Sequence, residues 1–199
     1  MRKDPIEFWF SIGSTYTYLT VMRLADVARK TGIDFSWHPF SVREIMLETN
    51  NMPFPESKPD KRDYMWRDLN RRAEKYGFPI PGPVRYPLEN FDLSNRLAVL
   101  AAKEGWCADY AREAYRNWFQ EGHQAGSEEN IKQTLSALDK DIPLTVEKAE
   151  SDAIQTEYAA NTQAARQRGI FGSPNFYVSG ELFWGDDRLE DAIGWYRSH

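Results

Sequence analysis

Hydroxyl side chains gather directly after the first apolar segment, Ile6–Phe10, where a helical pattern begins. Backbone N–H groups at the start of a helix lack intrahelical partners and favour a negative charge there. A hydroxyl at such a place can donate to a ligand thiolate and so favour the charged form of a thiol. Ser14 is therefore the candidate catalytic residue, with Ser11, Thr15 and Thr17 as alternative donors. A plain helix N-cap is the structural alternative for Ser14.

A second candidate, Ser173-Pro174, precedes a short strand pattern near the C-terminus. A proline there is compatible with a cis peptide bond. The backbone of Ser173 could then pair with an extended ligand as an added strand does. A trans proline that simply opens the strand is the alternative.

A third candidate is the acidic turn formed by Asp186, Asp187 and Arg188. Acidic side chains at a helix start can bind an ammonium group, while the backbone N–H groups there bind a carboxylate. A free α-amino acid end carries both charges. Asp187 and Glu190 also have the spacing of a capping box, which predicts Asp187 as the N-cap of the last helix.

Lys61 and Asn51 form the weakest candidate. Lys61 falls in the first turn of a predicted helix, where a cation is mildly unfavourable against the helix dipole. A functional contact would explain its position, and a solvated surface lysine is the alternative.

The elements that must position these residues form two α/β segments. In the first, a strand at Ile6–Phe10, a helix at 15–30 and a strand at 33–40 predict a parallel βαβ unit. In the second, strand patterns at Asn175–Val178 and Glu181–Trp184 flank a two-residue hairpin turn, and a last helix follows.

The stretch between the two α/β segments has helical patterns and no convincing strand. Helices are predicted at 60–76, 93–103 and Cys107–Phe119, one capped by Ser127 and a long last one capped by Thr145. Residues 50–59 and 77–83 read as loops because of their proline and glycine content. The order predicts an α/β, thioredoxin-like fold with a large all-helical insertion. We expect a thioredoxin-like domain at 1–41 plus 169–199 and a helical insertion domain at 42–168.

Composition excludes several classes of function. The 199 residues carry a net charge of −5 and no basic block, which argues against a nucleic-acid surface. No apolar run reaches the roughly 18 residues of a membrane helix, and no signal-peptide core is present, so we expect a cytoplasmic protein without a membrane partner. The single cysteine, Cys107, excludes an internal disulfide and a Cys-x-x-Cys pair. The histidines share no metal-ligand spacing, and no metal site is predicted.

Five short motifs, in order, resemble the 2-hydroxychromene-2-carboxylate isomerase family, which is related to kappa-class glutathione transferases and DsbA-like oxidoreductases. They lie at 14–19, 51–53, 59–65, 171–174 and 183–189. The resemblance covers essentially the whole chain. Thr15 and Thr17 depart from the family pattern, which has proline and serine there. The stretch 91–96 does not clearly match the substrate-side residues, which leaves the chromene substrate open.

The resemblance implies a glutathione site. Ser14 would contact the glutathione sulfur, Lys61 a carboxylate, and Asp186 with Asp187 the γ-glutamyl end. Pro174 would be the cis-proline. The complete predicted set of glutathione-binding residues is Asn51, Lys61, Ser173, Pro174, Asp186, Asp187 and Arg188.

The leading hypothesis is a glutathione-dependent isomerase that acts on an aromatic or unsaturated carboxylic acid by reversible thiolate addition. The alternatives are a kappa-like glutathione transferase and a non-catalytic thioredoxin-fold binding protein. A disulfide oxidoreductase is disfavoured because the chain has no Cys-x-x-Cys pair. The family further implies a homodimer and a place in aromatic compound catabolism.

Overall fold

A four-stranded sheet in the order β2-β1-β3-β4 is the centre of the computed structural model. The structure describes residues 3–51, 57–78, 80–82, 84–88 and 91–199. The strands are β1 (Ile6–Phe10), β2 (Phe35–Pro39), β3 (Asn175–Val178) and β4 (Glu181–Trp184). β1 pairs in parallel with β2 and antiparallel with β3, and β3 pairs antiparallel with β4. The predicted parallel βαβ unit and the C-terminal hairpin are both confirmed.

β1 is largely buried because all of its residues except Glu7 are apolar, and they lie on both faces of the sheet. Phe8 is fully buried and lies in register with Trp37 on β2 and Phe176 on β3. Its ring stacks on that of Phe176, with 5.6 Å between centroids, and meets Trp37 edge-on at 4.9 Å. The hairpin between β3 and β4 turns at Ser179 and Gly180, whose φ angles of 51° and 86° are those that a tight two-residue turn requires.

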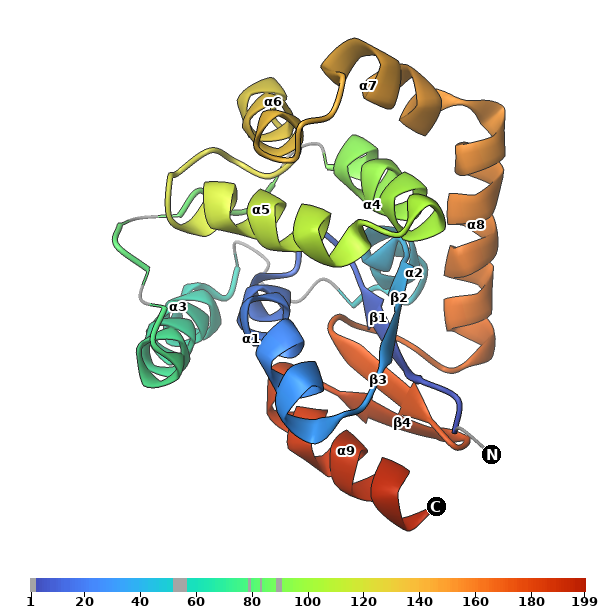
Figure 1. The fold of residues 1–199 in the computed structure, drawn as a ribbon. Coiled ribbons are helices and arrows are strands. Elements are labelled where there is room, and N and C mark those ends of the chain that lie inside the picture. The colour runs from blue at the N-terminus through green and yellow to red at the C-terminus, as the bar shows by residue number, and fades with distance from the viewer. Residues whose placement is uncertain (1–2, 52–56, 79, 83, 89–90) are drawn as a thin grey trace.

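Helices make up the rest of the fold. α1 (Thr15–Thr31) connects β1 to β2, and η1 (Asp186–Arg188) with α9 (Leu189–Ser198) follows β4. Between β2 and β3 lie α2 (Val42–Glu48), α3 (Pro59–Tyr76), α4 (Asp92–Glu104), α5 (Cys107–Phe119), α6 (Glu128–Ala137), α7 (Ile142–Glu150) and α8 (Asp152–Gln167). In Figure 1, α4 to α7 lie together at one end of the molecule, α8 runs along its side, and α9 lies at the opposite end.

The prediction of one long helix capped by Thr145 is wrong. Two helices occupy this stretch, because Ser151 adopts an extended backbone between α7 and α8 (φ −63°, ψ 150°). Asp141 caps α7 by accepting a hydrogen bond from the Leu144 N–H at 2.9 Å, and Thr145 lies inside the helix. The helical pattern of the sequence continues on both sides of Ser151, so the sequence does not indicate that the helix ends there. The Ser127 cap is confirmed, since its hydroxyl accepts from the Asn130 N–H at 3.2 Å.

The predicted capping box at Asp187 and Glu190 is also wrong. η1 precedes α9, and Arg188 occupies the N-cap position of α9. The Arg188 side chain makes no capping hydrogen bond. The Asp187 carboxylate pairs instead with Arg188 at 2.9 Å, and Glu190 pairs with Arg23. An ion pair with the next residue and a long-range ion pair thus replace the capping hydrogen bonds that the spacing predicted.

A single buried cluster joins the sheet to the helices of the predicted insertion. It includes Phe8 and Leu24 from the α/β part together with Leu97, Tyr115 and Leu135 from the helical part. The sheet and these helices therefore share one core, and the domain limits at 41/42 and 168/169 stay a prediction. Within the described residues, no helix is both long enough and apolar enough to cross a membrane.

Candidate active site

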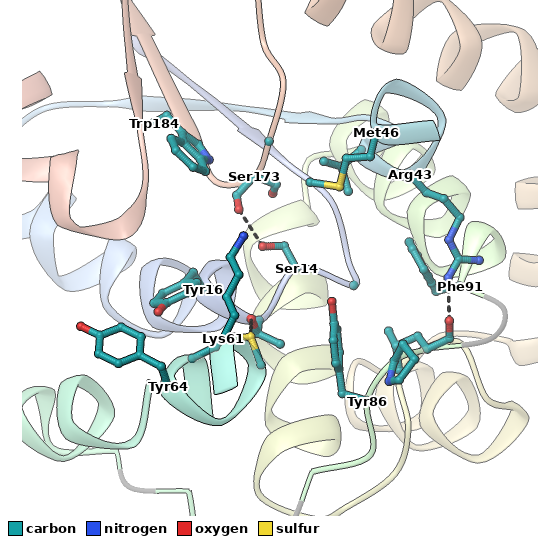
Figure 2. Close-up of a pocket in the computed structure, with 17 residues that line it drawn as sticks. Ser14, Tyr16, Arg43, Met46, Lys61, Tyr64, Tyr86, Phe91, Ser173 and Trp184 are labelled. Carbon is teal, nitrogen blue, oxygen red and sulfur yellow. Dashed lines mark hydrogen bonds between the residues drawn. The ribbon is translucent and has the colours of Figure 1, made fainter. Parts of the chain in front are cut away.

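Ser14 lies at the junction of β1 and α1 with its side chain turned away from the helix. Its backbone occupies the N-cap position of α1, but its hydroxyl makes no cap hydrogen bond. The hydroxyl donates instead to the Ser173 carbonyl oxygen at 2.7 Å (Figure 2). The N-cap alternative thus describes the backbone of Ser14 and not its side chain.

The alternative hydroxyl donors are buried and engaged elsewhere. Ser11 donates to Asn95 Oδ1 at 3.4 Å, and Thr15 donates to the Met65 sulfur at 3.1 Å. Thr17 shares a hydrogen bond of 2.9 Å with the Ser173 hydroxyl. Relative exposure is at most 3% for these three residues, whereas Ser14 is half-buried. The structure therefore favours Ser14 as the donor available to a ligand.

Side chains of the helical segment fix the loop that carries Ser14. The Tyr115 hydroxyl donates to the carbonyl oxygens of Ser11 and Ser14, both at 3.0 Å. Burial raises the pKa of Tyr115, so this phenol stays a donor. Gly13 has a φ of 130°, and a Cβ added there would lie 2.7 Å from the Phe91 ring. The close approach of Phe91 and the positive φ together explain a glycine at this position.

Asn95 on α4 binds the same loop through both backbone polar groups of Ile12. Its Oδ1 accepts from the Ile12 N–H at 2.8 Å, and its Nδ2 donates to the Ile12 carbonyl at 3.2 Å. Asn95 and Ile12 are fully buried, so water cannot replace these hydrogen bonds.

Replacing Asn95 with alanine is expected to destabilise the protein by about 2–5 kcal/mol, because two buried backbone groups lose their partner. Urea unfolding measures this change. Asn70→Ala is the matched control, since the Asn70 side chain is exposed and donates to the Trp66 carbonyl within its own helix, α3. Equal destabilisation by the two substitutions would show that Asn95 does not hold the loop.

Ser14 lines a cavity of about 350 Å³ whose wall is mostly apolar. Lys61 reaches it from the first turn of α3, which begins at Pro59, a favoured first helical residue. Figure 2 shows the Lys61 side chain directed toward Ser14 and Ser173. We call this space the first cavity. The other lining residues used below are Arg43, Tyr86, Phe91 and Trp184.

A second cavity, of about 220 Å³, adjoins the first and is charged. Both cavities are lined by Tyr16, Ser173 and Trp184. The other residues that line the second cavity are Asp68, Arg72, Pro174, Gly185, Asp186 and Asp187. The Tyr16 hydroxyl donates to Asp68 Oδ2 at 2.9 Å, and burial with this contact raises the pKa of Tyr16.

Asp186 and Asp187 have different environments although they are neighbours. Asp186 is 1% exposed, and Asp187 is exposed and paired with Arg188. The Asp186 carboxylate accepts hydrogen bonds from four side chains, Thr20, Arg23, Arg72 and Tyr76. A ligand contact to the Asp186 side chain would displace one of these donors, whereas Asp187 is accessible.

The Ser173–Pro174 peptide bond is cis, and both residues line the second cavity. The Ser173 hydroxyl accepts from the Ser11 N–H at 3.0 Å, and the Ser173 carbonyl accepts from Ser14. That carbonyl, which the sequence suggested as exposed to a ligand, is thus hydrogen-bonded within the protein.

The structure brings most of the predicted site residues together around the two cavities: Ser14, Lys61, Ser173, Pro174, Asp186 and Asp187. Asn51 and Arg188 are not among the described residues that line them. Asn51 is exposed after α2, and its N–H donates to the Met46 carbonyl at 2.8 Å. Met52 and Pro53 of the same motif lie outside the described residues. Arg188 is exposed and pairs with Asp187 and Asp191.

Sequence reasoning missed several lining residues, notably Arg43, Tyr86, Asp68 and Arg72. Arg43 belongs to α2, a seven-residue helix too short for a clear periodic pattern. Tyr86 follows the proline-rich loop. Asp68 and Arg72, four residues apart on α3, lie on one helix face, and this spacing was the one available signal.

The strand order β2-β1-β3-β4 and the cis-proline at 174 define a thioredoxin fold. Ser14 occupies the first strand-to-helix junction, so this protein has no redox cysteine at that place. The model of the DSBA-like thioredoxin domain family matches residues 5–193, and the chain belongs to that family.

The chain is similar to curated proteins over nearly its whole length. A 2-hydroxychromene-2-carboxylate isomerase of Sphingobium xenophagum is 28% identical over 186 residues, which cover 93% of this chain and 94% of that protein. An isomerase of the same name from Pseudomonas putida is 26% identical over 193 residues, 95% and 94% of the two chains. Glutathione s-transferase kappa 2 of Caenorhabditis elegans is 23% identical, covering 94% of this chain and 89% of that protein.

Solved structures agree with these relatives. A 2-hydroxychromene-2-carboxylate isomerase superposes with a TM-score of 0.82 and 26% identity, covering 96% of this chain and 95% of that one. The cytosolic disulfide reductase DsbM of Pseudomonas aeruginosa, solved with GSH, has a TM-score of 0.64 at 18% identity, covers 96% and 98% of the two chains, and shows the shared fold alone. The predicted family resemblance and the thioredoxin-like fold with its helical insertion are confirmed.

Proposed function

We propose that the protein is a glutathione-dependent isomerase acting on an aromatic or unsaturated carboxylic acid. The observation that carries the proposal is the Ser14 hydroxyl, which lines an apolar cavity at the start of α1 and is not used as a cap. The whole-length similarity to proteins named 2-hydroxychromene-2-carboxylate isomerase supports the type of reaction.

Glutathione binding would exchange one hydrogen bond for two. Ser14 donates to the Ser173 carbonyl in the structure without a ligand. When a thiolate binds, the Ser14 hydroxyl turns to the sulfur and the Ser173 carbonyl accepts the cysteinyl N–H of glutathione. A hydroxyl donor and a helix N-terminus both favour the thiolate, so the pKa of the bound thiol falls.

The charged ends of glutathione match charged residues around the two cavities. Lys61 suits the glycyl carboxylate next to the first cavity. Asp187 and Asp68 suit the α-ammonium of the γ-glutamyl end in the second cavity, and Arg72 suits its carboxylate. Asp186 then acts by holding η1 in place. The roles predicted for Asn51 and Arg188, the homodimer and the cytoplasmic location stay predictions.

The reaction requires no redox change. The thiolate adds to an activated double bond of the substrate, and the bond that remains is single and can rotate. Expulsion of the thiolate then restores the double bond in the product and returns the cofactor. The protein lowers the thiol pKa and orients the reactants.

Turnover with a small amount of glutathione tests the proposal against the transferase alternative. With 2-hydroxychromene-2-carboxylate in large excess over glutathione, an isomerase brings the substrate to equilibrium with its product and leaves the thiol concentration unchanged. The kappa-class relative favours the alternative, in which one thiol disappears for each product formed. If the amount of thiol lost equals the amount of product formed, the protein is a transferase and not an isomerase.

A third outcome would identify a non-catalytic binding protein. In that case neither conversion nor conjugation occurs at any glutathione concentration. If glutathione binds, a concentration a hundredfold above Kd stabilises the fold by about 2.7 kcal/mol. The absence of both turnover and this thermal shift would remove glutathione from the account.

A further inference from the structure

Tyr115 reaches the turn that carries Ser14 from α5, a helix of the segment between β2 and β3. Its side chain is fully buried, and its ring stacks on that of Trp118 with 5.8 Å between centroids. The centroid of the Phe119 ring lies 6.1 Å from that of Tyr115. These contacts fix the place of the phenol, so its hydroxyl can hold the backbone groups that lie beside it.

Two carbonyl oxygens of the turn converge on the Tyr115 hydroxyl. The Ser11 and Ser14 oxygens each lie 3.0 Å from it, and the Ser11 oxygen also accepts from the Ser14 N–H at 3.2 Å. Burial raises the pKa of Tyr115, so the phenol keeps its proton and donates at neutral pH. The negative ends of two peptide dipoles therefore point at Tyr115.

The direction of the Ser14 carbonyl sets the direction of the Thr15 N–H. The two groups belong to one planar trans peptide, in which the C=O and the N–H point in opposite directions. Thr15 is the first residue of α1, so its N–H has no acceptor within the helix, and Thr15 lines the first cavity with Ser14. With its carbonyl held at Tyr115, this peptide presents the positive end of its dipole on the side away from Tyr115.

We propose that Tyr115 is a positioning residue for thiolate binding, because it holds the Ser14–Thr15 peptide with its N–H toward the sulfur and its carbonyl away from it. This inference rests on the proposed function and adds a residue that lines neither cavity. Without the phenol hydroxyl, the two carbonyl oxygens lose a fixed donor, and the peptide can turn its negative end nearer the sulfur. A thiolate is then less stable, and the pKa of the bound thiol rises.

Tyr110 offers a matched control on the same helix. Like Tyr115, it is buried, and its hydroxyl donates to a backbone carbonyl, that of Ser94, at 3.0 Å. Ser94 belongs to α4 and not to the turn that carries Ser14. Tyr110→Phe and Tyr115→Phe both remove a buried hydroxyl and keep the ring, so the two variants separate a structural role from an electrostatic one.

The first experiment measures the thiolate absorbance of the glutathione complex against pH in the wild-type, Tyr115→Phe and Tyr110→Phe proteins. The second repeats the comparison in a Ser14→Cys background, which places a thiol at the junction and needs no glutathione. The pKa of this thiol is read from the rate of alkylation by iodoacetamide against pH. Cys107 is buried and burial raises its pKa, so it reacts slowly, and the wild-type protein gives this background rate.

We expect Tyr115→Phe to raise the pKa of the thiol by about 0.5 to 1 pH unit in both experiments, the size expected for the loss of one hydrogen bond. Tyr110→Phe should leave both values as in the parent protein. Both variants should unfold at a lower urea concentration than their parent, because each loses a buried hydrogen bond. If Tyr115→Phe does not fold, 3-fluorotyrosine incorporated at position 115 keeps the hydroxyl, makes it a stronger donor and should lower the thiol pKa.

Equal thiol pKa values in Tyr115→Phe and Tyr110→Phe would overturn the role of Tyr115, whether both move or neither does. A fluorotyrosine protein whose thiol pKa is not lower would do the same. A shift of the Ser14→Cys thiol alone, with glutathione bound and its pKa unchanged, would also overturn it.

Failure of the proposed function is a separate result, in which the wild-type protein does not bind glutathione. The Ser14→Cys proteins then decide the role of Tyr115 on their own, since they show whether its hydroxyl favours a thiolate at this junction. A rise of the thiol pKa in Tyr115→Phe and not in Tyr110→Phe would support that role, and equal values would overturn it.

Discussion

Replacing Ser14 with alanine is expected to raise the pKa of the bound glutathione thiol by about one to two pH units and to lower kcat by about 10²- to 10³-fold. The substitution removes the one half-buried hydroxyl of the junction cluster. Thiolate absorbance of the glutathione complex, followed against pH, measures the first effect, and turnover under saturating glutathione measures the second.

Thr15→Val is the control for this prediction. It removes a hydroxyl one residue further along, but that hydroxyl donates to the Met65 sulfur at 3.1 Å. We expect the thiol pKa to stay as in the wild type. A thiol pKa that moves in Thr15→Val and not in Ser14→Ala would transfer the role to Thr15, and no movement in either would remove hydroxyl stabilisation from the account.

Asp186→Ala is expected to destabilise the fold by about 3–5 kcal/mol, because it leaves Arg23 and Arg72 without the buried carboxylate between them. The side-chain exposure of Asp186 is 1%, so solvent screening there is small. Asp186→Asn keeps the shape and is the milder variant if Asp186→Ala does not fold. Thermal and urea unfolding measure the loss.

Asp187→Ala is the matched control at the neighbouring position, and we expect it to weaken glutathione binding while leaving the fold stable. Its ion pair with Arg188 is exposed, and such pairs contribute little to stability because solvent screens them, so we expect almost no loss of stability. Glutathione binding, measured by calorimetry, should weaken by about tenfold, which is the loss of one charged contact. Equal stability losses at the two positions, or glutathione affinity that depends on neither, would contradict the roles assigned to them.

Much of the site could be predicted because its residues belong to strong local patterns. Ser14 follows an apolar strand and opens a helix, and Ser173-Pro174 opens another strand, so the sequence identified both junctions. The sheet then brings them together, since β1 and β3 are neighbours. The Ser14 hydroxyl reaches the Ser173 carbonyl although the two residues are 159 positions apart.

The residues that could not be predicted depend on contacts between distant segments. Nothing local distinguishes Asp186 from Asp187, because burial of the former follows from Arg23 on α1 and Arg72 on α3. Arg23 also pairs with Glu190 and so draws it away from the capping box that its spacing predicted. Arg43 escaped notice because its contacts, the Leu88 carbonyl and the Phe91 ring, are more than 40 residues away in the chain.

A crystal structure of the protein soaked with glutathione tests the central claim most directly. The account predicts the sulfur within hydrogen-bond distance of the Ser14 hydroxyl, the cysteinyl N–H on the Ser173 carbonyl, and the γ-glutamyl end beside Asp187 in the second cavity. The rest of the first cavity should remain open for the second substrate. Glutathione bound elsewhere, or a Ser14 hydroxyl still donating to Ser173 with the sulfur out of reach, would contradict it.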